Sequence, residues 1–278
     1  MRLISNFIIL LGLLFPIEYS DYGFEIFSLS GDSKIHSLAG CPHDYSMSVN
    51  DLYTLNDFHE KGKLSLTYTN YYSGLINYFQ SSYIYKSTDK AKIGISFLHK
   101  EIKNIPNTQN AWVDLGSIIS QDQIDYSNIE FYDDRQVALI LLYSFSSRTG
   151  SYGLKIKPIY TSLLDFSAFG IAFDLGFNKA INDKVKLGLN IENIFSYNKW
   201  STGKVYSKYP KINLSNSYKS KSFYLMNEIS IKFKQSSIDR FIYAFGLEKE
   251  FKNSLNLRFG YRDRTIALGF GFRYKDVF

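Results

Sequence analysis

The last part of the chain alternates large apolar residues with small or charged ones at every second position. Leucine and aromatic residues hold one parity between residues 255 and 262, and after a turn at Asp263 the alternation restarts over residues 266–275. Successive strand residues point to opposite faces, so each segment predicts a strand with one strongly apolar face. A soluble sandwich also alternates, but its apolar face points inward and it needs no aromatic ending. A barrel with its apolar face toward lipid and a terminal Phe278 fits better.

The composition agrees with a lipid-facing barrel. Aromatic residues make up 17% of the 278 residues, with 23 Tyr and 23 Phe. A membrane barrel would place many of these side chains in two aromatic rings at the membrane interfaces, whereas an aromatic-rich soluble core accounts less well for so many tyrosines. The net charge of +6 is dispersed, without a block of Lys and Arg, so no nucleic-acid partner is indicated. The expected partner is outer-membrane lipid.

Residues 1–20 predict a signal peptide. Arg2 supplies a positive start, and Phe7–Phe15 is a nine-residue apolar run. A buried strand or short helix is the alternative interpretation. The run is too short for a transmembrane helix, which takes about 20 residues. We therefore expect export followed by insertion as a barrel into the outer membrane of a Gram-negative-type bacterium.

Residues 21–60 show poor periodicity and predict an N-terminal plug, or periplasmic segment, tucked into or under the barrel. The segment holds Cys41, the single cysteine of the chain, so an internal disulfide is excluded. We expect Cys41 to be a small buried side chain.

Residues 61–278 predict an all-β fold, a transmembrane up-and-down antiparallel β-barrel of 12–14 strands. A weak strand through residues 210–217 is needed for an even count of twelve, and a hairpin inside 101–134 would give fourteen. On this count the long interruptions 101–134 and 195–206 lie on the outer side. The remaining strands are expected near residues 64–69, 76–85, 92–97, 137–145, 152–157, 168–177, 185–192, 228–233, 241–248, 255–262 and 266–275.

Eleven charged residues lie on the parity opposite the apolar rows, and we expect them to face the lumen: Lys155, Lys157, Asp174, Lys186, Glu192, Glu228, Lys232, Glu248, Arg258, Arg262 and Arg273. Opposite charges across a narrow lumen would pair and plug it. A path for an anionic headgroup is the alternative. Few bulky apolar residues share the inward parity, which argues against an apolar ligand pocket.

Catalytic and metal-binding patterns are absent from the sequence. None of the four histidines forms a His-x-Ser pair on one strand face, and Cys41 and His43 lack a second pair of metal ligands. We therefore expect no catalytic residues, no metal, no cofactor and no enzymatic activity.

A set of short segments along the predicted strands can be compared with known barrel families: residues 152–157, 173–176, 187–194, Trp200 with Gly203, 246–248, 257–261 and 267–271. Together they resemble the PorV/PorQ-type outer-membrane barrels, relatives of the FadL-type transporters of hydrophobic compounds. The resemblance covers roughly residues 35–275 and implies around fourteen strands with a periplasm-facing N-terminal plug. The family usually has Asn-Pro-Ala before the first strand, whereas this chain has Leu55-Asn56-Asp57-Phe58.

Two functions follow from this resemblance. The first is a non-enzymatic barrel that serves protein export or surface assembly through its outer loops, with secretion-machinery or exported proteins as partners. The alternative is a FadL-like transporter of hydrophobic small molecules. Fold alone does not decide between them.

Overall fold

The computed structural model describes residues 18–20, 22–41, 61–112, 124–234, 237–251 and 255–272. Strands dominate these residues, and the helices are short. The elements, in chain order, are β1 (Glu18–Tyr19), η1 (Glu25–Ser28), α2 (Ser33–Ser37), β2 (Gly62–Tyr71), η3 (Tyr72–Gly74), β3 (Ile76–Lys86), β4 (Ala91–Asn107), η5 (Tyr126–Asn128), β5 (Glu130–Ser146), β6 (Ser151–Leu163), β7 (Phe166–Ala180), β8 (Val185–Trp200), β9 (Val205–Ser207), β10 (Lys211–Lys219), β11 (Phe223–Lys234), β12 (Ser237–Phe251), β13 (Leu255–Arg262) and β14 (Thr265–Phe272).

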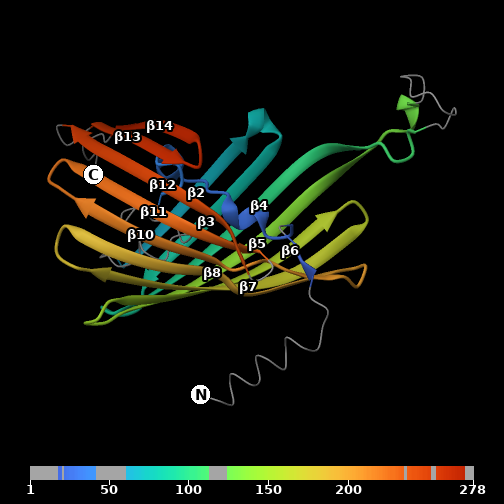
Figure 1. The fold of residues 1–278 in the computed structure, drawn as a ribbon. Coiled ribbons are helices and arrows are strands. Elements are labelled where there is room, and N and C mark those ends of the chain that lie inside the picture. Colours follow the sequence, from blue (N-terminus) through green and yellow to red (C-terminus); the bar gives the residue numbers. More distant parts are fainter. Residues whose placement is uncertain are drawn as a thin grey trace, which may run out of the picture.

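The strands form one curved sheet that wraps around the N-terminal segment (Figure 1). In the described part of the chain, twelve strands run in sequence order from β2 to β14, and β9 lies off this path. Neighbours on the path are antiparallel, whereas β1 pairs in parallel with β9. The predicted all-β antiparallel barrel is confirmed. No helix among the described residues is long and apolar enough to cross a membrane.

The N-terminal segment bridges β2 and β14, the first and last strands of this path, from the inside. No backbone pairing joins these two strands within the described residues. Tyr71 of β2 instead donates a hydrogen bond to the carbonyl of Ser30. On the other side α2 packs on β14, where a Cβ at Gly269 would lie 2.2 Å from the Cβ of Ser37. Residues 30–37 therefore link the two edges of the sheet, and β14 needs glycine at this contact.

Both long interruptions that the sequence predicts contain strand. Both ends of the segment 101–134 are strand, because β4 and β5 are each 17 residues long and project from the barrel as an arm (Figure 1). Residues 195–221 likewise contain the end of β8 and all of β9 and β10. Outside the bilayer both faces of a strand can be polar, so apolar alternation does not mark these segments.

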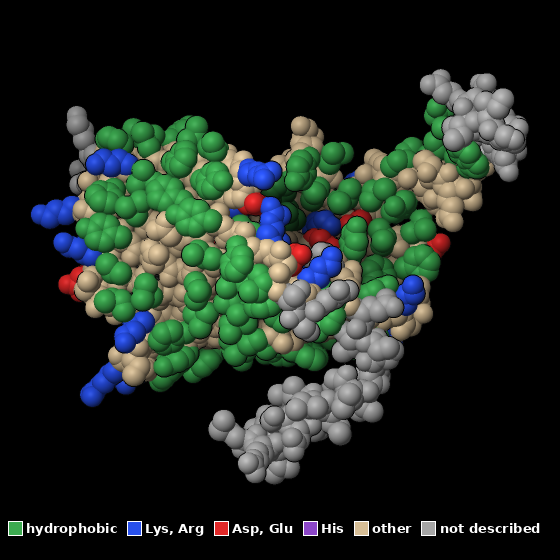
Figure 2. All heavy atoms as spheres, viewed as in Figure 1, with side chains coloured by type: hydrophobic (Ala, Val, Ile, Leu, Met, Phe, Trp, Pro, Cys, Tyr) green, Lys and Arg blue, Asp and Glu red, His purple; other side chains and the backbone are tan. Residues whose placement is uncertain are grey.

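The outward face is apolar, as predicted. In β7, Phe169 and Leu175 are 59% and 44% exposed, whereas Ala172 and Asp174 are buried. Apolar side chains cover the wall of the barrel in Figure 2, and several Lys and Arg lie at the left-hand end of the view, opposite the arm. This surface fits a lipid environment, in which every backbone polar group must be paired within the sheet.

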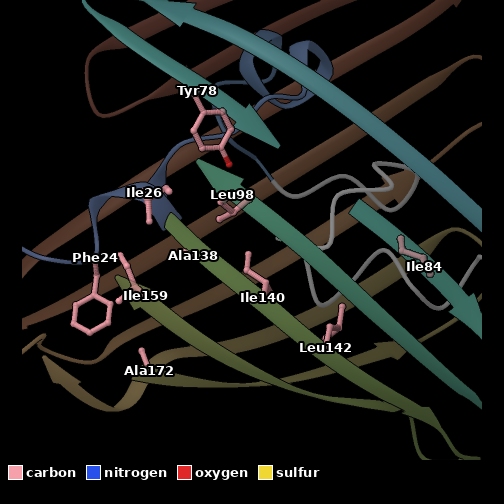
Figure 3. Close-up of a cluster of buried hydrophobic side chains, with 10 residues drawn as sticks. All are labelled: Phe24, Ile26, Tyr78, Ile84, Leu98, Ala138, Ile140, Leu142, Ile159 and Ala172. Atoms are coloured by element: carbon pink, nitrogen blue, oxygen red, sulfur yellow. The ribbon is translucent and has the colours of Figure 1, made fainter. Parts of the chain in front are cut away.

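The inward face differs from the prediction, because part of it is apolar. The expectation of few bulky apolar residues there is wrong for β3 to β7. Strand β5 is apolar on both faces, so its alternation is hidden, and Figure 3 shows its inward residues beside those of neighbouring strands. We define the apolar inner wall as the buried residues Ile84, Leu98, Ala138, Ile140, Leu142, Ile159 and Ala172.

Candidate functional site

The lumen contains the N-terminal segment, and we call its residues 22–41 the plug. The plug enters at Gly23, whose φ of +99° favours glycine. It then forms η1 and α2, both inside the sheet (Figure 1). Helix α2 begins after Asp32, whose carboxylate accepts a hydrogen bond from the backbone of Lys34 at 2.8 Å. The plug is therefore ordered locally by its own turns and then held by the wall.

The first half of the plug packs on the apolar inner wall. Phe24 and Ile26 are buried in the same cluster as the wall residues (Figure 3). Gln136 of β5 accepts a hydrogen bond from the backbone of Ile26 at 3.2 Å and donates one to Glu25 at 3.0 Å. Apolar burial thus holds this half, and one amide side chain fixes its register.

The second half of the plug is held by a second cluster on β11 and β12 and by Arg262 of β13. Leu38 and Cys41 are fully buried there, which confirms the expectation for Cys41. Arg262 donates to the carbonyls of Ala39 and Gly40 at 2.7 and 2.9 Å, and to Glu228 at 2.8 Å. Because Arg262 joins the plug to the wall, this lumen charge positions the plug.

A further ionic group lies between α2 and the strands β12 and β13. Glu248 accepts from Arg258 at 2.6 Å and lies 3.5 Å from Lys34 of the plug. Burial is the main reason that the pKa of Lys34 lies below its usual value; Glu248 opposes this shift and Arg258 adds to it. Lys34 and Glu248 also border a cavity of about 340 Å³, together with residues 219–224.

A buried ion pair lies at a bulge in the opposite wall. The pairing of β7 with β8 shifts register between Phe173 and Leu175, and Asn193 turns inward with a φ of +54°. Asp174 accepts from Lys157 at 2.7 Å and from the backbone of Asn193 at 2.8 Å. The ammonium of Lys157 also lies 5.1 Å from the ring centroid of Phe27 in the plug. This pair therefore also contacts the plug.

Glu192 forms the centre of another polar group beside the bulge. It accepts from Asn213 at 2.6 Å and lies 2.9 Å from Lys211. The sequence does not mark Lys211 as a lumen-facing residue, because its strand, β10, is only weakly apolar. Lys211 and Asn213 lie on the same parity of β10, and this spacing is the signal that would place both side chains in the lumen.

The predicted lumen-facing charges occupy different environments. Lys155, Lys157, Asp174 and Glu228 are buried, whereas Lys232 is exposed. The remaining described members are partly buried, and Arg273 lies outside the described residues. The structure pairs Lys157 with Asp174, Glu228 with Arg262, and Glu248 with Arg258.

Comparison with known proteins identifies the fold. No protein-family model matches the chain, and no curated protein matches it. Structures of the toluene transporter TodX of Pseudomonas putida do match. One has a TM-score of 0.58 at 12% identity, over 90% of this chain and 91% of TodX. Another has a TM-score of 0.57 at 11% identity, over 83% and 82%.

The chain folds as a transmembrane antiparallel β-barrel. A TodX variant lacking S2, described as a monoaromatic hydrocarbon channel, matches with a TM-score of 0.56 at 10% identity over 91% of this chain and 90% of its own. Identities this low support the fold, and the function must be argued from the lumen of this chain.

Proposed function

We propose that this protein is a non-enzymatic, FadL-like channel that carries small apolar molecules across the outer membrane. The observation that carries the proposal is the apolar inner wall, seven buried side chains that face the lumen along β3 to β7. A water-filled pore needs a polar lining, whereas a path for apolar molecules needs such a surface. The apolar exterior supports the membrane location, and the TodX fold is compatible with this role.

In this proposal the plug is the gate. It covers the apolar inner wall with Phe24 and Ile26, so an apolar molecule can follow the wall only when these side chains withdraw. The polar contacts that hold this half are few, with Gln136 bonding to Ile26 and Glu25. The second half is held more firmly by Arg262 and by the buried Leu38 and Cys41. The first half is therefore the part that moves.

The arm favours a second candidate function, protein export or surface assembly of the PorV/PorQ type. The arm extends β4 and β5 beyond the barrel, and its outer part exposes Trp112, Tyr126 and Phe131. Exposed aromatic side chains at the end of a projecting hairpin are typical of partner-binding surfaces. Secretion-machinery or exported proteins would be the partners.

One experiment separates the two functions. Intact Gram-negative cells that express the chain, or a variant in which residues 108–129 are replaced by a short Gly-containing turn, are given radiolabelled toluene and sampled within seconds. A channel should raise uptake above that of cells without the protein, and the shortened variant should keep this increase. Export through the arm predicts the reverse, with no effect on uptake and loss of co-purifying partner proteins from the shortened variant.

A second measurement addresses conduction. We expect the purified protein in planar bilayers to show no steady large conductance, because the plug and its ion pairs fill the lumen. A variant that lacks residues 22–41 should conduct ions. A steady open channel in the intact protein would contradict the plugged lumen.

A further inference from the structure

The apolar inner wall has a hollow where its residues are small. Ala138 of β5, Gly170 of β7 and Ala172 of β7 face the lumen around the larger Ile159 of β6. Glycine is needed at position 170, because a Cβ there would lie 2.9 Å from the Oδ1 of Asn198 and 3.0 Å from the Cγ2 of Ile159. The short side chains of Ala138 and Ala172 leave a low part of the wall beside Ile159, which a side chain of the plug can cover.

The plug residue Phe24 fills this hollow. Phe24 is 2% exposed and belongs to one cluster with Ile159 and Ala172. Figure 3 shows its side chain beside both residues. Phe24 comes from the half of the plug that contacts the wall through few polar groups, so the ring can leave while the second half stays bound.

The rim of the hollow carries polar side chains that Phe24 cannot satisfy. Asn198 of β8 is fully buried, and neither its Nδ2 nor its Oδ1 has a hydrogen-bond partner among the described residues. The hydroxyl of Thr161 likewise has no hydrogen-bond partner among the described residues. Thr161 follows Ile159 on the same face of β6. Asn198 borders the hollow directly, because its Oδ1 would lie 2.9 Å from a Cβ at Gly170 and its Nδ2 2.2 Å from one at Gly23. Buried donors and acceptors normally have partners.

We propose that the hollow is a binding site for a small aromatic molecule with a hydroxyl or amino group, and that Phe24 occupies it in the resting state. The ring of the ligand takes the place of the Phe24 ring, against Ile159 and Ala172. Its polar group bonds to the amide of Asn198. An apolar pocket with a few fixed polar groups is the usual form of a small-molecule site. The inference rests on the proposed channel function and names its substrate class.

Binding to purified protein in nanodiscs tests this site separately from transport. Phenol and toluene serve as probes, because they have the same ring and differ in the hydrogen-bonding group. Phe24→Ala empties the hollow and should bind phenol at least about tenfold more tightly than the unaltered chain does. In this background Asn198→Leu should remove the preference for phenol over toluene, since the hydroxyl then has no partner. Leu38→Ala is the matched control, because it truncates a buried plug residue in the other cluster.

The outcomes are distinct. Equal phenol affinity in Phe24→Ala and the unaltered chain would overturn the site, as would a phenol preference that survives Asn198→Leu or appears equally in Leu38→Ala. Heat-modifiable migration on gels confirms that each variant is folded, and a variant that fails this check is replaced by Phe24→Val or Asn198→Val. Binding as expected without toluene uptake by cells would refute the channel and leave the site standing, whereas uptake without binding would refute the site alone.

Discussion

Replacing Asp174 with asparagine should lower the free energy of unfolding by about 3–5 kcal/mol, the largest effect that we expect of any single substitution on stability. The side chains of Lys157 and Asp174 are 5% and 3% exposed, so the variant leaves the ammonium of Lys157 buried without its counterion. The backbone of Asn193 also loses a charged acceptor. Urea titration in phospholipid vesicles, followed by tryptophan fluorescence, measures the change.

Two comparisons make this test specific. Asp263→Asn breaks the ion pair with Arg240, which is much more exposed, and should cost no more than about 1 kcal/mol. Adding Lys157→Met to Asp174→Asn removes the unpaired charge and should recover most of the loss. If Asp174→Asn and Asp263→Asn have equal effects, the pair is not buried as described here.

Replacing Phe173 with arginine should cost about 2–4 kcal/mol, because this position is near the middle of β7 on the outward face. The ring of Phe173 packs on Phe195, 5.9 Å away between centroids, so some of the loss is packing. Phe173→Leu keeps an apolar surface and measures that part. The difference between the two variants is the cost of a charge in lipid.

Tyr126→Arg is the control for position. Tyr126 lies on the arm and is 69% exposed, outside the lipid-facing wall, so arginine there should change stability little. The free energies come from the same urea titrations in vesicles. Equal effects of arginine at Phe173 and Tyr126 would show that the outward face of β7 is not in lipid.

The strands that the sequence predicts well are those with lipid on one side and the lumen on the other. Strands β7, β13 and β14 alternate cleanly because their two faces meet different surroundings. The arm alternates less clearly, since water surrounds both of its faces. Strand β5 is apolar on both faces, and the pattern of one strand cannot show whether its second apolar face lines a lumen.

The candidate site was only partly predictable. Parity placed Lys157 and Asp174 in the lumen, but their pairing depends on the register of β6 with β7. Gln136 and Ile26 are 110 residues apart in sequence, and no local pattern connects them. Asn198 is a polar residue in a segment without clear alternation, so the sequence does not mark it as part of a site. Only the folded structure brings Gly23 and Gly170 close to its side chain.

A reducible cross-link between plug and wall tests the central claim, that apolar molecules pass when the plug withdraws. A Cβ at Gly23 would lie 4.0 Å from that of Asn198, within the range of a disulfide. The variant Gly23→Cys/Asn198→Cys, with Cys41→Ala to leave a single thiol pair, is expressed in intact cells. Toluene uptake is measured before and after treatment with dithiothreitol. We expect the oxidised form to take up no more toluene than cells without the protein, and reduction to restore uptake. Equal uptake by the oxidised and reduced forms would contradict the gate.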